Sequence, residues 1–322
     1  MTSSIEKAAQ RLEQLRKAGA VLPGDKPRVQ NPGVPDESQP LNHVPQFAAP
    51  AADGDHAAPE LRAVSKTVQL DLTALSASGF VTPGSPRSVT TDQYRVIKRP
   101  LLENAMGKGA SLVTNGNLIM VTSALPGEGK SFTAINLAMS LAMELDHTVM
   151  LVDADVTRPS VMSKLGLPPA AGLLDMLRGG QTKLADVLLR TNVEGLTLLP
   201  AGLPHDRATE LLASDAMTDL LDEMSKRYSD RIIIFDSPPL LLTTEARVLA
   251  NHMGQVVVVV RAERTLQSEV EHALSTIEAC PIKLLVLNQV RSQGLGAHGY
   301  GYGYWHGGYG RATEERMPAA AA

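Results

Sequence analysis

Cysteine and aromatic residues are scarce in this chain of 322 residues, and each scarcity excludes a class of protein. The single cysteine, Cys280, excludes an intramolecular disulfide and a zinc site built on two or more thiolates. Aromatic side chains make up 3% of the residues and hydrophobic ones 43%, which favours an α/β core of aliphatic residues over an aromatic-rich β-sandwich. The reducing cytoplasm suits this composition.

Long hydrophobic runs and an excess of basic residues are also missing. No stretch reaches the roughly 18 consecutive apolar residues that a membrane-spanning helix requires. The first residues, MTSSIEKAAQRLEQLRKAG, are charged and lack the apolar segment of a secretory signal, so we expect a cytoplasmic chain. The net charge of −4 and the pI near 6.1 argue against binding of nucleic acid, for which a basic surface is the usual sign.

The part of the chain before residue 92 shows little sign of a packed domain. Residues 1–19 carry apolar side chains at helical spacing, which is typical either of an isolated amphipathic helix or of a helix that docks on a partner. Eight prolines between residues 20 and 59 interrupt any helix or strand, so we assign residues 20–91 to a disordered linker. Within it, residues 66–82 predict a short strand and a turn of helix, and form a candidate docking segment.

Residues 92–291 alternate apolar strands with helical segments. The strand-length runs are continuously apolar, as expected for strands buried on both faces of a sheet. They lie at 118–122, 148–152, 196–199, 232–235, 256–260 and 284–287. Helices are predicted at 92–106, with Pro100 as a break or kink, and at 131–144, 208–227, 244–251 and 266–279. This order predicts an α/β domain with a mostly parallel, doubly wound sheet.

A phosphate-binding loop joins the first predicted strand to the helix at 131–144, which makes the expected fold that of a P-loop NTPase. The segment ALPGEGKS has Ala124 where such loops usually begin with glycine, and ends in Gly129, Lys130 and Ser131. Its glycines allow backbone N–H groups to turn toward a phosphate, and the helix N-terminus faces the same anion. Lys130 is predicted to reach the β- and γ-phosphates of ATP, and Ser131 to offer its hydroxyl to Mg²⁺. The predicted nucleotide-binding residues are Pro126, Gly127, Glu128, Gly129, Lys130, Ser131 and Phe132.

Carboxylates follow two of the other predicted strands. Asp153 and Asp155 come after the strand at 148–152, and Asp236 follows the strand at 232–235. Ligands of parallel sheets bind at the carboxyl ends of the strands, beside the P-loop, where Asp236 is predicted to assist a metal ion. An aspartate after a strand is also often an ordinary helix cap. In the same way, Arg261 and Asn288 either hold a base or ribose or are ordinary polar residues at strand ends.

Three segments in this order resemble the nucleotide motifs of the bacterial tyrosine kinases, the P-loop autokinases of exopolysaccharide export. They are ALPGEGKS at 124–131, LVDADVTRP at 151–159 and IIIFDSPP at 232–239. The resemblance covers about residues 90–291. The N-terminal helix, the stretch YRVIKRPLLENA and the Tyr-rich end are similar, more narrowly, to the exosortase-associated tyrosine autokinases. Those are stand-alone cytoplasmic chains that work beside a separate membrane protein, the chain-length determinant.

The resemblance implies a role for each carboxylate. Asp153 corresponds to the acceptor of the tyrosine proton, while Asp155 and Asp236 help to hold the Mg²⁺ shell. The family usually has an arginine two residues after the second aspartate, whereas Thr157 stands there in this chain and Arg158 follows. The implied catalytic residues are Lys130, Asp153 and Asp155, and the implied metal ligands are Ser131, Asp155 and Asp236.

An oligomerisation helix is implied by the same resemblance. The Glu-x2-Arg-x2-Arg pattern of the family appears here as Asp92, Arg95 and Lys98, with the sign of the charge kept at each place. Lysine lacks the bidentate fork of arginine, so this version of the pattern predicts a weaker contact between subunits of a ring.

Four of the six tyrosines in the chain lie close together near its C-terminus. They are Tyr300, Tyr302, Tyr304 and Tyr309, in the segment GYGYGYWHGGYG of the predicted flexible tail at 292–322. The segment is typical either of a sticky low-complexity tail or of an autophosphorylation substrate. Each phosphate would add about −1.5 to −2 charges, so multiple phosphorylation would make neighbouring tails repel and a ring disassemble.

The pattern as a whole predicts an ATP- and Mg²⁺-dependent protein-tyrosine autokinase that regulates exopolysaccharide synthesis and export. The expected partners are further copies of the chain and a membrane-embedded chain-length determinant at the inner face of the cell membrane. One alternative is a partitioning or positioning ATPase, although Leu125 stands where that class usually has a second lysine. The other is a nucleotide-binding scaffold of polysaccharide export without enzymatic activity.

Overall fold

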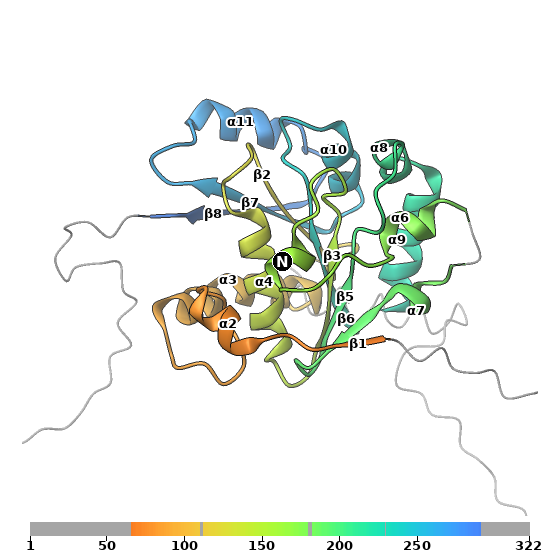
Figure 1. Cartoon of the computed structure of the whole chain (residues 1–322). Coiled ribbons are helices and arrows are strands. Elements are labelled where there is room, and N and C mark those ends of the chain that lie inside the picture. The colour runs from red at the N-terminus through yellow and green to blue at the C-terminus, as the bar shows by residue number, and fades with distance from the viewer. Residues whose placement is uncertain (1–65, 110–111, 180–181, 229, 291–322) are drawn as a thin grey trace, which may run out of the picture. The chain divides into compact units, whose positions relative to one another are not determined.

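The computed structural model describes residues 66–109, 112–179, 182–228 and 230–290 (Figure 1). The predicted helix at 1–19, most of the predicted linker and the predicted tail lie outside these ranges. Within the described ranges, no helix combines the length and the apolar character needed to cross a bilayer.

A single eight-stranded sheet forms the centre of the fold. Its order is β1-β4-β5-β3-β6-β2-β7-β8, and every neighbouring pair is parallel except the antiparallel pair of β4 and β5. The strands are β1 (Lys66–Val68), β2 (Leu118–Ser123), β3 (Thr148–Asp153), β4 (Leu189–Thr191), β5 (Leu196–Leu199), β6 (Arg231–Asp236), β7 (Gln255–Arg261) and β8 (Ile282–Asn288). The prediction of a mostly parallel, doubly wound sheet is confirmed, and all six predicted strands are present.

Helices cover both faces of this sheet (Figure 1). Four of them pack on one face: α2 (Leu72–Ala77), α3 (Val89–Ala105), α4 (Lys130–Ala142) and α5 (Val161–Lys164). The other face carries α6 (Leu173–Leu177), α7 (Leu184–Val187), α8 (Ala208–Leu212), α9 (Asp215–Arg227), α10 (Thr244–Asn251) and α11 (Gln267–Ser275).

The central strand β2 is apolar over residues 118–121 because both of its faces are covered. Leu118 and Met120 belong to the core on the face of α6–α11, while Ile119 and Val121 belong to the core beneath α2–α5. All six residues of β2 are buried. Because helices cover both faces, side chains that alternate between the faces are all withdrawn from water, and no polar residue is favoured at either set of positions.

Residues 66–82, which the sequence placed in the linker as a candidate docking segment, pack on this same core. β1 pairs in parallel with β4 at one edge of the sheet, and Leu70, Leu75 and Val81 are buried in the core beneath α2–α5. The Val81 N–H donates to the Asn136 side chain on α4 at 2.7 Å. The segment is thereby held against the helix that follows the P-loop.

The helix α3 corrects the predicted oligomerisation set. Asp92 and Arg95 form an exposed ion pair at 3.1 Å, but Lys98 is only 4% exposed and points into the fold. Its ammonium donates to the Ser140 carbonyl at 2.6 Å, in the last turn of α4, and pairs with Glu144 at 2.6 Å. Carbonyls in the last turn of a helix lack intrahelical donors, and Lys98 satisfies one of them. Lys98 is therefore not part of an exposed face for a neighbouring subunit.

Candidate active site

The P-loop lies between β2 and α4, and two of its glycines have backbone conformations that other residues rarely adopt. The φ angles are 80° at Gly127 and 98° at Gly129. A Cβ on Gly129 would also lie 2.1 Å from the Asn288 amide nitrogen, which donates to the Glu128 carbonyl at 2.9 Å. The sequence of the loop is thus dictated both by backbone strain and by its close approach to the end of β8.

The side chain of Glu128 stabilises the P-loop through hydrogen bonds to its neighbours. Its side chain is 2% exposed and accepts hydrogen bonds from the Leu125 N–H at 2.7 Å, from the Thr265 hydroxyl and from the Arg261 N–H at 3.4 Å. These contacts tie the loop to the segment that follows β7. Glu128 does not line the cavity described below, so any contact it makes with a nucleotide is through its backbone.

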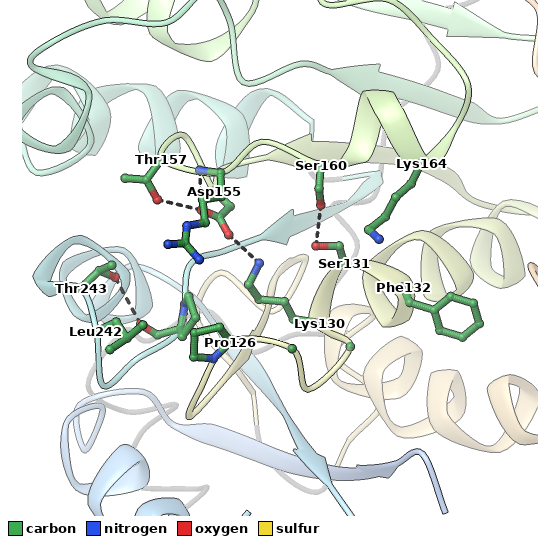
Figure 2. Close-up of a pocket in the computed structure, with 14 residues that line it drawn as sticks. Pro126, Lys130, Ser131, Phe132, Asp155, Thr157, Ser160, Lys164, Leu242 and Thr243 are labelled. Carbon is green, nitrogen blue, oxygen red and sulfur yellow. Dashed lines mark hydrogen bonds and ion pairs between the residues drawn. The ribbon is translucent and has the colours of Figure 1, made fainter.

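A cavity of about 590 Å³ opens over the P-loop at the carboxyl ends of the strands (Figure 2). Its lining includes the polar residues Lys130, Ser131, Asp155 and Arg158 and the apolar residues Pro126, Pro239 and Leu242. Phe132, the last of the predicted nucleotide-binding residues, lines the cavity as well, and its ring stacks on Phe80 with a centroid distance of 4.9 Å.

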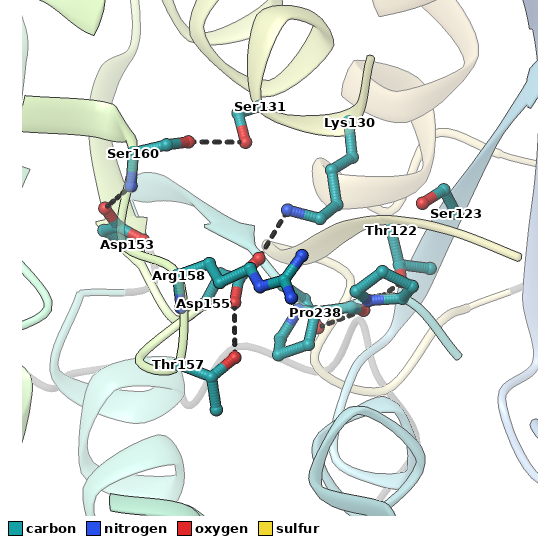
Figure 3. Close-up of polar contacts among 12 residues, drawn as sticks. Thr122, Ser123, Lys130, Ser131, Asp153, Asp155, Thr157, Arg158, Ser160 and Pro238 are labelled. Carbon is teal, nitrogen blue, oxygen red and sulfur yellow. Dashed lines mark hydrogen bonds and ion pairs between the residues drawn. The ribbon is translucent and has the colours of Figure 1, made fainter. Parts of the chain in front are cut away.

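The P-loop lysine makes a short ion pair inside this cavity. Lys130 Nζ lies 2.5 Å from Asp155 Oδ2, and the two side chains are 13% and 4% exposed (Figure 3). The other carboxylate oxygen of Asp155 accepts from the Thr157 hydroxyl at 3.0 Å and from the Arg158 N–H at 3.2 Å. Both oxygens of Asp155 are therefore held, and the carboxylate faces the position at which a nucleotide phosphate would meet Lys130.

Asp153 lies deeper than Asp155. One of its oxygens, Oδ2, accepts from the Ser160 and Val161 N–H groups at 3.0 Å each, whereas Oδ1 is buried without a hydrogen-bond partner. Burial and the charge of Asp236 raise the pKa of Asp153 to about 7. The residue is fully buried and does not line the cavity.

Asp236 and the Ser131 hydroxyl suit a hard cation. Both oxygens of Asp236 are buried without a hydrogen-bond partner, and burial raises its pKa to about 6 against the opposing effects of the Lys130 ammonium and the nearby Ser131 hydroxyl. Ser131 Oγ instead contacts Ser160 Oγ at 2.9 Å. Among the described residues, no three Asp, Glu, His or Cys side chains form a metal cage. The buried, unpartnered oxygens of Asp236 and the hydroxyl of Ser131 are hard oxygen donors of the kind that Mg²⁺ uses, since this ion takes one or two carboxylates and completes its shell with phosphates and water.

The residues predicted to hold a base or ribose lie on the other side of the P-loop. Asn288 supports the loop backbone, as described above, and Gln289 Nε2 donates to the Gly127 carbonyl at 3.2 Å. Arg261 lines a separate recess of about 380 Å³ together with Arg264 and Gln289. The interpretation of Asn288 as a structural strand-end residue agrees with these contacts.

The structure thus brings Lys130, Ser131, Asp153, Asp155 and Asp236 together at one end of the sheet, whereas Asp92 and Arg95 lie on α3 and the tail tyrosines lie outside the described residues. Four further residues line the cavity but were not predicted from the sequence: Ser160, Lys164, Leu242 and Thr243. Ser160 and Lys164 flank or end α5, whose four residues are too few to show a helical period, and Leu242 and Thr243 precede α10 in a loop without a motif.

Comparison with known proteins identifies the family. A family model described as "AAA domain" matches residues 116–285. Tyrosine-protein kinase YwqD of Bacillus subtilis is 32% identical over 200 residues, covering 62% of this chain and 80% of that protein. Tyrosine-protein kinase ptk of Acinetobacter johnsonii is 34% identical over 182 residues, 56% of this chain, but the match spans only 24% of that longer protein.

Solved structures agree with the sequence comparison. The crystal structure of the chimerical protein CapA2B2 superposes with a TM-score of 0.53 at 29% identity and covers 68% of this chain and 98% of that one. The family match covers the P-loop, the strand-end aspartates and most of the sheet. The chain therefore belongs to the bacterial tyrosine-protein kinase family.

Proposed function

We propose that the chain is an ATP- and Mg²⁺-dependent protein-tyrosine autokinase that phosphorylates its own cluster Tyr300, Tyr302, Tyr304 and Tyr309. The observation that carries the proposal is the cavity over the P-loop, where Lys130 meets the Asp155 carboxylate at 2.5 Å and apolar residues also line the space. In the transfer, the bond from the γ-phosphorus to the oxygen of the ADP leaving group breaks. A new bond forms to the phenol oxygen, and the phenol proton passes to a carboxylate.

Lys130 is the cation that we assign to the phosphoryl group being transferred. In this structure it is paired with Asp155, so a bound nucleotide would compete with that carboxylate for the ammonium. Arg158 lines the same cavity and provides a second positive charge, although Thr157 stands at the family's arginine position. Electrostatic stabilisation of the transferring group supplies most of the catalysis in phosphoryl transfer.

Ser131, Asp155 and Asp236 are the residues that would hold Mg²⁺. When bound, the ion neutralises charge on the β- and γ-phosphate oxygens. The unpartnered oxygens of Asp236 support this assignment, because a buried carboxylate without a hydrogen bond is costly unless a cation completes it. The Ser131 hydroxyl must leave Ser160 to take part.

Asp153 is our candidate for the general base. Its Oδ1 has no partner, and a pKa of about 7 suits proton acceptance near neutral pH. Asp155 lies closer to the cavity, but both of its oxygens are already engaged. Because Asp153 is covered in this structure, the assignment requires the segment from Thr157 to Ser160 to move when substrates bind.

The cellular role is proposed from the family. The resemblance of the three nucleotide motifs to the autokinases of exopolysaccharide export supports a chain that works in exopolysaccharide synthesis and export, beside a membrane-embedded chain-length determinant at the inner face of the membrane. The Tyr-rich end and the stretch YRVIKRPLLENA support the exosortase-associated subtype. Self-association would use the exposed pair of Asp92 and Arg95.

An immunoblot tests the activity itself. The purified full chain is incubated with ATP and MgCl₂ and probed with an anti-phosphotyrosine antibody, with a sample containing EDTA as the control. We expect a signal that grows with time and disappears with EDTA. Hydrolysis of ATP without phosphotyrosine would indicate a partitioning-type ATPase, and nucleotide binding without either reaction would indicate a scaffold.

A further inference from the structure

Leu242 is an exposed apolar residue that lines a cavity containing the charged side chains of Lys130, Asp155 and Arg158. It follows β6 and the segment DSPPLL, is 60% exposed, and lines the cavity together with Pro126 and Pro239 (Figure 2). The preceding residues Leu240 and Leu241 pack against the core, so Leu242 is the member of this leucine run that is left toward the cavity. Leaving a leucine exposed forgoes the stabilisation that its burial would bring, and the core contacts of its neighbours do not require it.

The backbone around Leu242 is fixed rather than free to collapse onto the core. The Leu240 N–H donates to the Ser123 carbonyl at 2.9 Å, and the Leu241 N–H donates to the Ala124 carbonyl at 3.3 Å. Arg247 Nε on α10 donates to the Leu240 carbonyl at 2.9 Å. These bonds attach the loop to the start of the P-loop, and hold Leu242 at the cavity that Pro126 and Lys130 also line.

We propose that Leu242, with Pro126 and Pro239, binds the phenyl ring of the acceptor tyrosine and makes this site selective for tyrosine. The inference rests on the proposed kinase function and names the acceptor subsite of that same cavity. A tyrosine side chain has an apolar ring and a reactive hydroxyl at its tip, which matches an apolar wall of Leu242, Pro126 and Pro239 in a cavity that the cations of Lys130 and Arg158 also line. A serine or threonine side chain has no ring to place on this wall.

The occupant is a tyrosine of the cluster between Tyr300 and Tyr309. The other two tyrosines are unsuitable, because Tyr94 on α3 is buried in the core and Tyr228 is partly buried, with the Arg231 guanidinium 5.0 Å from its ring centre. Every tyrosine of the cluster has at least one glycine beside it. Glycine lets the backbone come close to the cavity rim, since no neighbouring side chain has to be accommodated.

Acceptor kinetics test this subsite. The full chain, with alanine at its four tail tyrosines so that its own rings do not compete, is given ATP, MgCl₂ and a synthetic peptide of sequence GYGYGYWHGGYG. The variants are Leu242→Asp, the conservative Leu242→Met, and Leu145→Asp as a matched control. Leu145 is a fully exposed leucine beyond the far end of α4, about 20 Å of helix away from the P-loop.

We expect Leu242→Asp to raise the KM for the peptide about tenfold at saturating ATP, as the loss of a leucine contact implies, and the Kd for ATP, measured alongside, to change less than this peptide KM. Leu242→Met should retain most of the peptide affinity, and Leu145→Asp should match the parent chain. A peptide KM unchanged in Leu242→Asp, or raised equally in Leu145→Asp, would overturn the assignment of this wall. Failure of the proposed function is distinct, because then the parent chain itself would transfer no phosphate to the peptide.

Discussion

The ion pair between Lys130 and Asp155 fixes the position of the P-loop lysine in the structure without a nucleotide. With Nζ held 2.5 Å from the carboxylate, the lysine is already positioned over the cavity, and the strand-end aspartate keeps it from folding back onto the loop. The pair also means that a nucleotide gains the ammonium only by displacing or sharing Asp155. Single substitutions at these residues therefore separate binding from transfer.

Replacing Lys130 with methionine removes the cation closest to the transferring phosphoryl group. We expect the initial rate of phosphate transfer from labelled ATP to tyrosine to fall about 10²–10³-fold, as for loss of one electrostatic stabiliser of a transition state. Lys226→Met is the matched control, because Lys226 forms an exposed pair with Asp222 on α9 and should leave the rate unchanged. A wild-type rate in Lys130→Met would show that this loop does not serve the reaction.

Replacing Asp153 with asparagine keeps the shape of the side chain and removes its ability to take a proton. We expect the transfer rate to fall about 10²–10⁴-fold while the Kd for ATP stays within a few fold. Rapid-quench measurements at saturating ATP, together with equilibrium binding of a fluorescent ATP analogue, give the two quantities. If binding is lost and the rate per bound ATP is unchanged, Asp153 serves the cation rather than the proton.

Among the secondary-structure elements, the sequence was sufficient where a continuous apolar run or a helical period is present. β8 departs from the expected burial on both faces, because it lies at the edge of the sheet and its residues alternate between partly buried and exposed. The six core strands and the helices α4, α10 and α11 were predicted close to their observed positions, because continuous apolar runs and helical periodicity leave little alternative. β1 was predicted only as a possible short strand within residues 66–82, and β4 was not predicted. Each has three residues and lies toward the sheet edge. The helices α5, α6 and α7 are too short for a period to show.

One helix differed from the prediction for a local reason. The predicted helix at 208–227 is divided into α8 and α9, because Ser214 caps α9 by accepting from the Met217 N–H. In α3, Pro100 was expected to break or kink the helix, and α3 continues without a break from Val89 to Ala105. Proline removes the N–H that would bond to Val96, and Val96 lies on the exposed side, where water can satisfy its carbonyl.

The burial of Lys98 could not be predicted from the charge pattern alone. The spacing Asp92-x2-Arg95-x2-Lys98 puts the charges about one helical turn apart, but only the packing of α3 on α4 shows that the lysine reaches the last turn of α4. The different positions of Asp153 and Asp155 could not be predicted either. That both follow a strand was predictable, but Asp153 is enclosed because the N–H groups of Ser160 and Val161 at the start of α5 bond to it, whereas Asp155 lines the cavity.

The pair of Lys98 and Glu144 predicts a pH dependence of stability. The Lys98 hydrogen bond holds the pKa of Glu144 below its usual value, so the folded state binds the proton less readily than the unfolded state. The stabilisation is therefore complete above the unfolded pKa of about 4.3 and is lost as the pH falls through the lower folded value. We expect Glu144→Gln to lower the free energy of unfolding by about 1 kcal/mol at pH 7, since the pair is partly exposed.

Urea unfolding at pH 7 and pH 3.5 measures this effect. The difference between the wild type and Glu144→Gln should shrink at the lower pH. Glu223→Gln, which breaks an exposed pair with Arg227 at 2.9 Å, is the control and should change stability less at pH 7. An equal effect of Glu144→Gln at both pH values would mean that the loss comes from packing and not from the charge.

At the scale of the whole molecule, the question is how the tail reaches an active site. About 12 residues separate Asn288 at the end of β8 from Tyr300, and such a tether spans at most about 40 Å when extended. That length permits transfer within one chain as well as between chains. We proposed above that the exposed pair of Asp92 and Arg95 on α3 serves self-association, and on that proposal we expect transfer between molecules.

A mixing experiment separates the two routes. One component is the inactive Lys130→Met chain with its tail intact, and the other is an active chain with phenylalanine at all four tail tyrosines. Transfer between molecules predicts label on the tail of the inactive chain, at a rate that rises with the concentration of the active one. Transfer within a chain predicts no label in the mixture, together with a wild-type rate per molecule that is independent of dilution.

Transfer of phosphate from ATP to the C-terminal tyrosines at the P-loop cavity is tested by mapping the phosphorylated residues. The full chain is incubated with ATP and MgCl₂ and examined by mass spectrometry. We expect phosphate on tyrosines of the cluster Tyr300, Tyr302, Tyr304 and Tyr309 in the wild type and none in Lys130→Met. Phosphate confined to Tyr94 or Tyr228, or ADP formation with no phosphotyrosine at all, would contradict it.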